Sequence, residues 1–226
     1  MKISNLRIKL LISVFIIVFL WQISKLWVYY LKQSSSKEID KKQKFEPILV
    51  TVYYEALCPD SKYFIIKQVV PTFNSIGNYI EIQLIPYGKA ETTVVKDDYT
   101  FECQHGAVEC AANIIHACSI NKIKDTRKQL EVVACMIKNN MHPMSILRSC
   151  TSQMDEYKSI VNCAQSIEGR RLLMKYGEIT KALDPAINFI PTITLDSEMD
   201  NQILILKNLL RQICQRIEIP LKECKS

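Results

Sequence analysis

The sequence predicts an α/β fold in which a sheet carries a disulfide-rich helical insertion, preceded by a hydrophobic N-terminal segment. Three observations lead to this prediction. Strand-like and helix-like apolar patterns alternate at both ends of the body, from residue 48 and again from residue 188. All nine cysteines follow residue 57, and six of them fall where helical patterns dominate. An apolar run covers residues 10–31.

Charge is distributed unevenly along the 226 residues. Residues 1–44 carry nine Lys/Arg and two acids, and the rest carries twenty Lys/Arg and twenty-one acids, so the net charge of +6 belongs to the N-terminal part. The body is nearly neutral and has no basic stripe with interleaved aromatic residues, which argues against nucleic-acid binding. An apolar content of 48% is that of a globular protein and not of a disordered chain.

Residues 1–31 are expected to be a signal peptide or a signal-anchor. Basic residues precede the apolar run, as in a secretory signal, but no alanine occurs before Ala56 to form the usual small-residue cleavage site. Taken as one span, the run has the ~20 residues that a bilayer requires, and Lys25 lies near enough to its end to reach the interface. Both alternatives export the body, and an uncleaved segment would hold it at a membrane with the body luminal.

Residues 32–46 are polar and charged, so we expect a linker there, followed by one domain over residues 47–226. In the oxidising secretory pathway most cysteines should pair, and because nine is an odd number, at least one is free or intermolecular. The sequence has no clear sorting address, so a lysosomal and an extracellular destination are both open.

The domain is predicted to begin with a strand, a helix and a second strand. Residues 48–54 are β-branched and aromatic, as in a buried strand. Cys58 and Pro59 follow, and proline is favoured at the first position of a helix. Apolar residues then recur at helical spacing up to Phe73, and residues 80–87 alternate as a second strand does.

The rest of the domain is predicted to be mainly helical. Residues 88–101 are polar and are expected to form a loop. A strand over 188–195, a turn or short edge element over 196–201 and an amphipathic helix over 203–217 end the chain. This order is that of a thioredoxin-like fold, in which a cysteine opens the first helix and a proline precedes a later strand. The helical insertion, about residues 102–183, holds five short helices: 107–120, 125–140, 143–150, 155–166 and 168–182.

Cys58 is the candidate attacking residue. It stands where a strand ends and a helix begins, so its thiolate would face unpaired N–H groups and the positive end of the helix dipole. The thiolate is the attacking species in disulfide exchange. Asp60, two residues further on, opposes a second negative charge. The alternative for Cys58 is a structural half-cystine or a buried, inert side chain.

Ser61 and Pro191 are the other two candidate catalytic residues. Ser61 occupies the position where a Cys-x-x-Cys motif has its second cysteine. Its hydroxyl can donate a hydrogen bond to a Cys58 thiolate but cannot attack a mixed disulfide, and its alternative role is helix capping. Pro191 either begins an ordinary strand or forms a cis bond in a loop that packs beside Cys58 and aligns a substrate backbone.

Residues 103–118 hold three cysteines and two histidines, the densest group of potential metal ligands. Their spacings lack the close Cys-x2-Cys pair of structural zinc sites, so we expect disulfides and no metal. His105 is expected to be a buried hydrogen-bonding residue, with proton transfer as the alternative. Eight cysteines besides Cys58 would form four bridges, with Cys214–Cys224 as a suggested pair: Cys103, Cys110, Cys118, Cys135, Cys150, Cys163, Cys214 and Cys224.

Three segments resemble the gamma-interferon-inducible lysosomal thiol reductase family. They are Val-Tyr-Tyr-Glu-Ala-Leu-Cys-Pro-Asp-Ser at residues 52–61, Pro-Tyr-Gly at 86–88, and the family signature Cys-Gln-His-Gly-x2-Glu-Cys-x2-Asn-x4-Cys, which is complete from Cys103 to Cys118. The resemblance covers about residues 48–224. It implies a thioredoxin-like fold and reduction of protein disulfides in an endolysosomal compartment or after secretion. Cys58 matches the attacking cysteine of the family, and Ser61 replaces the second cysteine of its usual Cys-x-x-Cys motif.

The sequence leaves three alternatives for the activity. The first is a monothiol oxidoreductase that acts on disulfide-containing proteins through Cys58 and is recycled by a small thiol such as glutathione or cysteine, with no other cofactor. The second is a catalytically weak protein that traps or binds cysteine-containing clients. The third is a disulfide-stabilised secreted binder in which Cys58 is inert.

Overall fold

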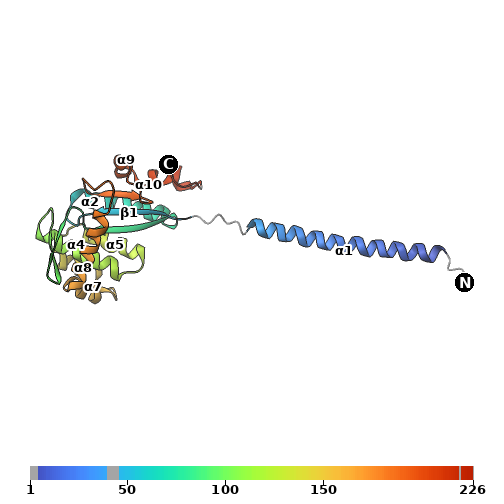
Figure 1. Ribbon diagram of the computed structural model, residues 1–226, viewed down its shortest axis with the longest axis horizontal. Helices are drawn as coiled ribbons and strands as arrows, with labels where there is room; N and C mark the ends of the chain where they lie inside the picture. Colours follow the sequence, from blue (N-terminus) through green and yellow to red (C-terminus); the bar gives the residue numbers. More distant parts are fainter. Residues whose placement is uncertain (1–4, 40–45, 219, 226) are drawn as a thin grey trace. The chain divides into compact units, whose positions relative to one another are not determined.

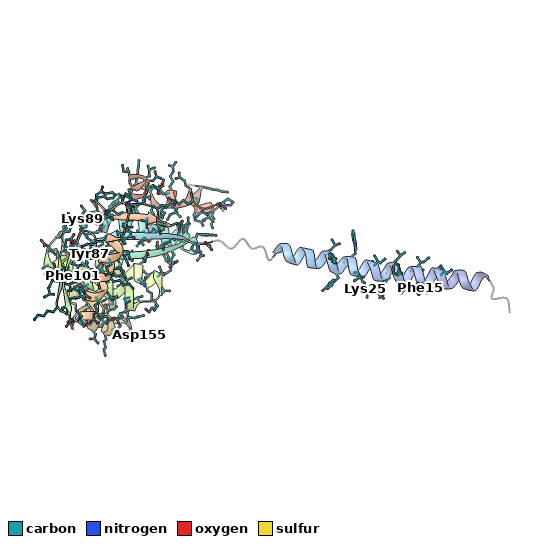
Figure 2. The ribbon with its side chains drawn as sticks, viewed as in Figure 1. Phe15, Lys25, Tyr87, Lys89, Phe101 and Asp155 are labelled. Carbon is teal, nitrogen blue, oxygen red and sulfur yellow. A yellow bond between two sulfur atoms is a disulfide. The ribbon has the colours of Figure 1, made fainter. Side chains whose placement is uncertain are left out.

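The computed structural model describes residues 5–39, 46–218 and 220–225. The chain divides into two compact units, residues 1–46 and 47–226. The first unit contains the single continuous helix α1 (Asn5–Ile39) (Figure 1). Its stretch Ile12–Leu31 is long and apolar enough to cross a membrane, and a signal sequence has the same properties. Phe15 and Lys25 project from this helix (Figure 2), and the side chains of the stretch are exposed.

The helix α1 is longer than the expected N-terminal segment, and it gives Lys25 a partner that the sequence did not indicate. The helix continues to Ile39, so the first part of the expected linker, residues 32–39, is helical, and residues 40–45 lie outside the described residues. The ammonium group of Lys25 lies 3.8 Å from the centroid of the Trp21 ring, which gives the charge a cation–π partner on the helix itself.

The second unit is built on a three-stranded sheet with the order β2-β1-β5. The central strand β1 (Ile48–Tyr54) pairs in parallel with β2 (Ile80–Pro86), from Ile48 opposite Ile80 to Tyr54 opposite Pro86. It pairs antiparallel with β5 (Thr192–Leu195). Because β1 has a strand on each side and almost all of its side chains are buried, its continuous apolar sequence is what a central strand requires.

A helical crossover connects the two parallel strands. It consists of α2 (Pro59–Phe64), the π-helical turn η1 (Ile65–Val69), α3 (Val70–Ile76) and the 3₁₀ turn η2 (Gly77–Tyr79). The π-helical turn ends two residues before Pro71, where the missing N–H removes a helical hydrogen bond. The apolar face predicted from the sequence is the buried face of this crossover: Phe64, Ile65, Val69 and Phe73.

Residues 88–101 do not form the expected loop. They contain most of an antiparallel hairpin, β3 (Glu91–Val95) and β4 (Asp98–Glu102), joined by a turn in which Lys96 has a positive φ of 55°. The prediction was wrong because the hairpin is largely exposed and so lacks the apolar alternation of a half-buried strand. The β-branched run Thr92–Val95 was the local signal for a strand.

The five predicted helices of the insertion are present, with ends that differ by a few residues. They are α4 (Ala107–Lys122), α5 (Thr126–Met136), α6 (Pro143–Thr151), α7 (Tyr157–Ala164) and α8 (Ile167–Lys181). The helix α4 is the centre of this layer, because it packs against the other four helices and against β2. Figure 1 shows α4, α7 and α8 on one side of β1, and α9 and α10 on the other.

In the C-terminal region the strand is shorter than expected, and the expected single helix is divided into two. The strand covers only Thr192–Leu195, and residues 196–201 form a turn in which Leu195 bridges Glu198. The single helix expected over 203–217 is divided into α9 (Gln202–Lys207) and α10 (Leu209–Cys214), followed by the 3₁₀ turn η3 (Lys222–Cys224). The break falls at Asn208, which has a φ of −155° and caps α10 by accepting the N–H of Arg211.

Eight of the nine cysteines form four disulfides, as the odd count and the secretory features predicted. Three tie the helical layer together, and the fourth confirms the suggested Cys214–Cys224 pair near the chain end. Cys58 is free. The pairs in the helical layer are Cys103–Cys110, Cys118–Cys163 and Cys135–Cys150. The cysteines of the signature are therefore unavailable as zinc ligands.

Candidate active site

Cys58 lies at the N-terminus of α2, four residues after the end of β1. It is the N-cap residue, and its carbonyl accepts the N–H of Lys62 at 3.0 Å, which begins the helix. The side chain is 8% exposed, and its sulfur donates a weak hydrogen bond to the carbonyl oxygen of Ile190 at 3.9 Å. The thiol therefore sits just below the surface, beside the free N–H groups of the first helical turn.

The structure brings the Pro191 loop against Cys58. The Ile190–Pro191 peptide bond is cis, and the Ile190 carbonyl is the group that faces the Cys58 sulfur. The loop is held by the hydroxyl of Thr192, which donates to the carbonyl of Phe189 at 2.7 Å. The Phe189 side chain is 37% exposed at this edge. The loop that contains Pro191 thus reaches Cys58 through Ile190, although 133 positions separate Cys58 from Pro191 in the sequence.

Ser61 is fully buried in the first turn of α2. Its hydroxyl oxygen accepts the backbone N–H of Glu55 at 3.3 Å, so it joins the helix to the segment that precedes Cys58. Ser61 was considered as a capping residue of its own helix, but its hydroxyl bonds the backbone of Glu55 instead. Asp60, which opposes a Cys58 thiolate, is exposed to solvent, where its charge is screened.

Side chains of the helical layer bind the backbone of Ala56 and Leu57, immediately before Cys58. The N–H of Ala56 donates to Asn113 Oδ1 at 2.9 Å, and the N–H of Leu57 donates to Glu109 Oε2 at 3.3 Å. Glu109 and Asn113 are four residues apart on α4 and so face the same way. Asn140 adds a long hydrogen bond, 3.4 Å, to the carbonyl of Ala56. Glu109 and Asn113 of the signature therefore fix the position of the backbone just before Cys58.

Glu55, the residue before Ala56, is buried, with only 1% of its surface exposed. Its Oε1 accepts the N–H of Lys89 at 2.8 Å. Burial raises the pKa of this carboxyl, and the nearby Glu109 carboxylate raises it further, while the Lys89 N–H and His105 act in the opposite direction. Gly88 makes room for it: Gly88 has a φ of +61°, and a Cβ there would lie 2.2 Å from Glu55 Cγ.

His105 is not buried as the sequence analysis expected, because its side chain is 35% exposed. The chain turns sharply here, and the next residue, Gly106, has a φ of +80°. The imidazole Nδ1 lies 2.6 Å from Glu109 Oε2 and 3.4 Å from Glu55 Oε2. The backbone N–H of His105 also donates to Glu109 Oε1 at 3.1 Å. The histidine therefore covers a pair of buried carboxylates.

His116, one turn after Asn113, is completely buried. Its Nε2 accepts from the Asn140 amide at 2.8 Å, so in the neutral ring Nδ1 carries the proton and donates to the Tyr54 hydroxyl at 3.0 Å. Burial lowers the pKa of this histidine from 6.5 to about 3. His116 therefore stays neutral and joins the end of β1 to the loop at residue 140.

Four residues of the site were not singled out from the sequence as site residues: Glu55, Gly88, Glu109 and Asn113. All four fall within the segments that carry the family resemblance. The spacing of Glu109 and Asn113 indicated one face of a helix, but nothing in the sequence indicated which backbone that face would meet.

Comparisons with known proteins agree with this geometry. Residues 49–165 match the family described as gamma interferon inducible lysosomal thiol reductase (GILT). A gamma-interferon-inducible lysosomal thiol reductase-like protein of Anopheles gambiae is 31% identical over 193 residues, which is 77% of this chain and 79% of the relative. The lysosomal thiol reductase of Carassius auratus is 32% identical over 155 residues, 67% of this chain and 61% of the relative.

The fold is also seen in a crystal structure of DsbA from Chlamydia trachomatis, with a TM-score of 0.54 and 14% identity over 78% of this chain and 91% of that one. The sheet, the free cysteine that opens α2 and the proline loop beside it define a thioredoxin-like fold of the DsbA type, and the family match places the chain in the thiol–disulfide oxidoreductase class. Within that class, the chain belongs to the gamma-interferon-inducible lysosomal thiol reductase family.

Proposed function

We propose that this protein reduces disulfides of other proteins through a single attacking thiol, that of Cys58, within the secretory pathway, in an endolysosomal or extracellular setting. The observation that carries the proposal is that Cys58 is the one cysteine outside the four disulfides and lies at the start of α2 against the Pro191 loop. The family and the fold support the same chemistry. The N-terminal segment would attach the protein to a membrane if it is not cleaved.

The proposed reaction proceeds through a mixed disulfide. The Cys58 thiolate attacks one sulfur of a substrate disulfide, a new bond to Cys58 forms, and the other substrate sulfur leaves as a thiolate that takes up a proton. A small thiol such as glutathione or cysteine then releases the substrate and becomes bonded to Cys58. A second small thiol restores Cys58 and leaves as a disulfide. The net change is one substrate disulfide reduced and two small thiols oxidised.

An apolar surface groove close to the site supports the proposal that the substrates are polypeptides. The groove runs between the start of α4 and the start of α6, lined by Val108, Met141 and Met144. Met141 follows Asn140, whose side chain bonds the backbone of Ala56 two residues before Cys58. Flexible methionines adapt to differing apolar segments, so a substrate chain held at Cys58 could cover this groove.

The proposal is tested by an assay of protein-disulfide reduction with glutathione or cysteine as donor, at acidic and neutral pH. We expect multiple turnover in the native protein and a loss of at least ~100-fold in Cys58→Ala, because no other thiol is available to attack. Equal turnover in both proteins would refute a role for Cys58. The ratio of rates at the two pH values indicates the compartment in which the enzyme works.

A second function is favoured by Ser61, which leaves Cys58 without a partner thiol to release a bound substrate. The protein would then trap cysteine-containing clients as long-lived mixed disulfides. Burst formation of one adduct per chain, lost in Cys58→Ala and without further turnover when the small thiol is added, would favour trapping over reduction. Recovery of the same clients with Cys58→Ala would show non-covalent binding.

A further inference from the structure

Three side chains that the redox chemistry does not use converge near the backbone that precedes Cys58, where Glu109 accepts the N–H of Leu57. Glu55 comes from the segment after β1, His105 from the turn before α4, and Glu109 from the first turn of α4. One carboxylate oxygen of each acid and Nδ1 of the imidazole all lie within 4.8 Å of one another. Both carboxylates are almost completely buried, at 1% and 0% exposure, whereas the histidine reaches the solvent.

One oxygen in this cluster has no hydrogen-bond partner. Glu55 Oε2 is buried and has no hydrogen-bond partner among the described residues; it lies 3.4 Å from His105 Nδ1, at ion-pair distance. The other oxygen of Glu55 is already held by the Lys89 N–H, which fixes the carboxylate plane. Buried carboxylate oxygens normally have hydrogen-bond partners or coordinate a metal, so the unpaired oxygen points to a ligand.

We propose that Glu55, His105 and Glu109 form a binding site for a divalent transition-metal ion of the zinc type. Two carboxylate oxygens and one imidazole nitrogen are a ligand set that zinc accepts, with the fourth position left to water. The ion would balance two buried carboxylates, whose neighbours are the His105 imidazole, the Lys89 ammonium group and the backbone N–H groups of Leu57, Lys89 and His105. This site goes beyond the proposed reductase function and does not depend on it.

The distances allow the ion with small movements. Ligands at ~2.0–2.2 Å from a tetrahedral zinc lie ~3.3–3.5 Å apart, and Glu55 Oε2 and His105 Nδ1 are already 3.4 Å apart. The His105–Glu109 pair, at 2.6 Å, must open by somewhat less than ~1 Å. His105 can supply this movement, because it lies on an exposed turn next to Gly106, around which a Cβ would meet nothing within 4 Å.

The hydrogen bonds that the two carboxylates accept from the backbone also suit a metal site. The Leu57 N–H and the His105 N–H each donate to an oxygen of Glu109, and the Lys89 N–H donates to Glu55. Hydrogen bonds of this kind orient the ligands and favour their charged forms. Because Glu109 also holds the segment before Cys58, a bound ion would fasten that segment to α4.

The experiment is titration calorimetry of Zn²⁺ into the full chain with its disulfides intact and with Cys58→Ala, so that the free thiol cannot bind the ion. We expect one Zn²⁺ per chain, removed by EDTA, and a rise in melting temperature when Zn²⁺ is added. In this background His105→Ala and Glu55→Gln should each weaken binding by ~100-fold or more. The matched controls, His142→Ala and Glu102→Gln, change an exposed histidine and an exposed glutamate outside the cluster and should leave the affinity unchanged.

His105→Ala is the decisive variant, because this side chain lies partly exposed on a turn outside the apolar core, and the circular dichroism of the variant should equal that of the parent. Zn²⁺ binding that is equal in His105→Ala and in the His142→Ala control would overturn the proposal. Absence of saturable binding in the parent would overturn it as well and would identify the cluster as a hydrogen-bonded pair of acids that shares a proton.

Discussion

At the scale of single residues, the chemistry of the site is set by the lack of a second thiol next to Cys58. Cys58 has no second thiol within its helix turn, because Ser61 takes that place and uses its oxygen to accept the N–H of Glu55. The residue that normally ends the mixed disulfide has thus become a structural one. The serine at position 61 therefore affects the step that releases substrate from the mixed disulfide, and not the attack of Cys58 on the substrate disulfide.

Ser61→Cys should therefore raise steady-state turnover and shorten the lifetime of the mixed disulfide, because the new thiol can attack it from within the molecule. The effective concentration of a neighbouring thiol gives an expected gain of ~10-fold or more at low donor thiol. The measurement is turnover at limiting glutathione, with Ser61→Ala as control. Ser61→Ala removes the acceptor for the Glu55 N–H, which should cost ~1–3 kcal/mol of stability and give no gain in rate. An equal gain in both variants would show that the thiol is not the cause.

Gly88→Ala should destabilise the domain strongly. Its Cβ would overlap Glu55 Cγ, and the positive φ adds backbone strain, so we expect a loss of ~2–4 kcal/mol in the free energy of unfolding. Gly77→Ala is the matched control, since Gly77 has a helical φ and a Cβ there makes ordinary contact, 3.5 Å, with the Phe73 ring. Its expected change is within ~1 kcal/mol, in either direction. Denaturant unfolding measures both, and similar losses would argue against the role of the Glu55 contact.

At the scale of elements, α4 connects the helical layer to the redox site. Glu109, Asn113 and His116 follow one another at spacings of four and three residues, so all three face the end of β1. Their partners are the backbone of residues 56 and 57 and the Tyr54 hydroxyl. The helix therefore sets the position of Cys58 without contributing a reacting group.

Asn113→Ala should leave the buried N–H of Ala56 without its acceptor. We expect a loss of ~1–3 kcal/mol in stability and, because the segment before the thiol is released, a changed rate of Cys58 alkylation in the folded protein. Asn121→Ala, at the less buried end of the same helix, is the control and should change neither quantity. Alkylation by a thiol-specific reagent, followed by mass spectrometry, measures the rate. An unchanged rate in Asn113→Ala would mean that α4 does not position the thiol.

The elements also show where sequence reasoning succeeds. The strand–helix–strand unit was predictable, since a buried central strand and an amphipathic crossover both leave strong patterns, as residues 48–54 and 64–73 do. The exposed hairpin at Glu91–Glu102 was not, because its strands lack the apolar alternation of a half-buried strand and its packing against α8 is a tertiary contact. The meeting of Cys58 with Ile190 and of Ala56 with Asn113 depends on how the layers stack, which one sequence does not determine.

At the scale of the whole molecule, pH acts through a buried histidine. Burial lowers the pKa of His116 from 6.5 to about 3 in the folded protein, so between these values the unfolded chain binds the proton and the folded one does not. The stability due to this residue is therefore present above about pH 6.5 and is lost progressively as the pH falls toward 3. At pH 5 the folded state keeps His116 neutral, and the linked loss relative to pH 7 is ~2 kcal/mol.

His116→Gln should flatten this dependence. The variant is expected to be less stable at pH 7, because the histidine packs between Tyr54 and Asn140, but to lose ~2 kcal/mol less than the native protein between pH 7 and pH 5. Denaturant unfolding at several pH values gives the slope, and His142→Gln, which alters an exposed histidine, should keep the native slope. If His116→Gln leaves the pH dependence of the unfolding free energy unchanged, His116 is not the source of the acid sensitivity.

The proposal that Cys58 is the single attacking thiol is tested most directly by mass-spectrometric mapping of the intermediate. The protein is mixed with a disulfide-bonded substrate, quenched with acid and digested without reductant. We predict that the substrate cysteine is found bonded to Cys58 alone, that the four structural disulfides are unchanged, and that Ser61→Cys shortens the lifetime of the adduct. Adducts on other cysteines, or reduction of substrate without any adduct on Cys58, would contradict it.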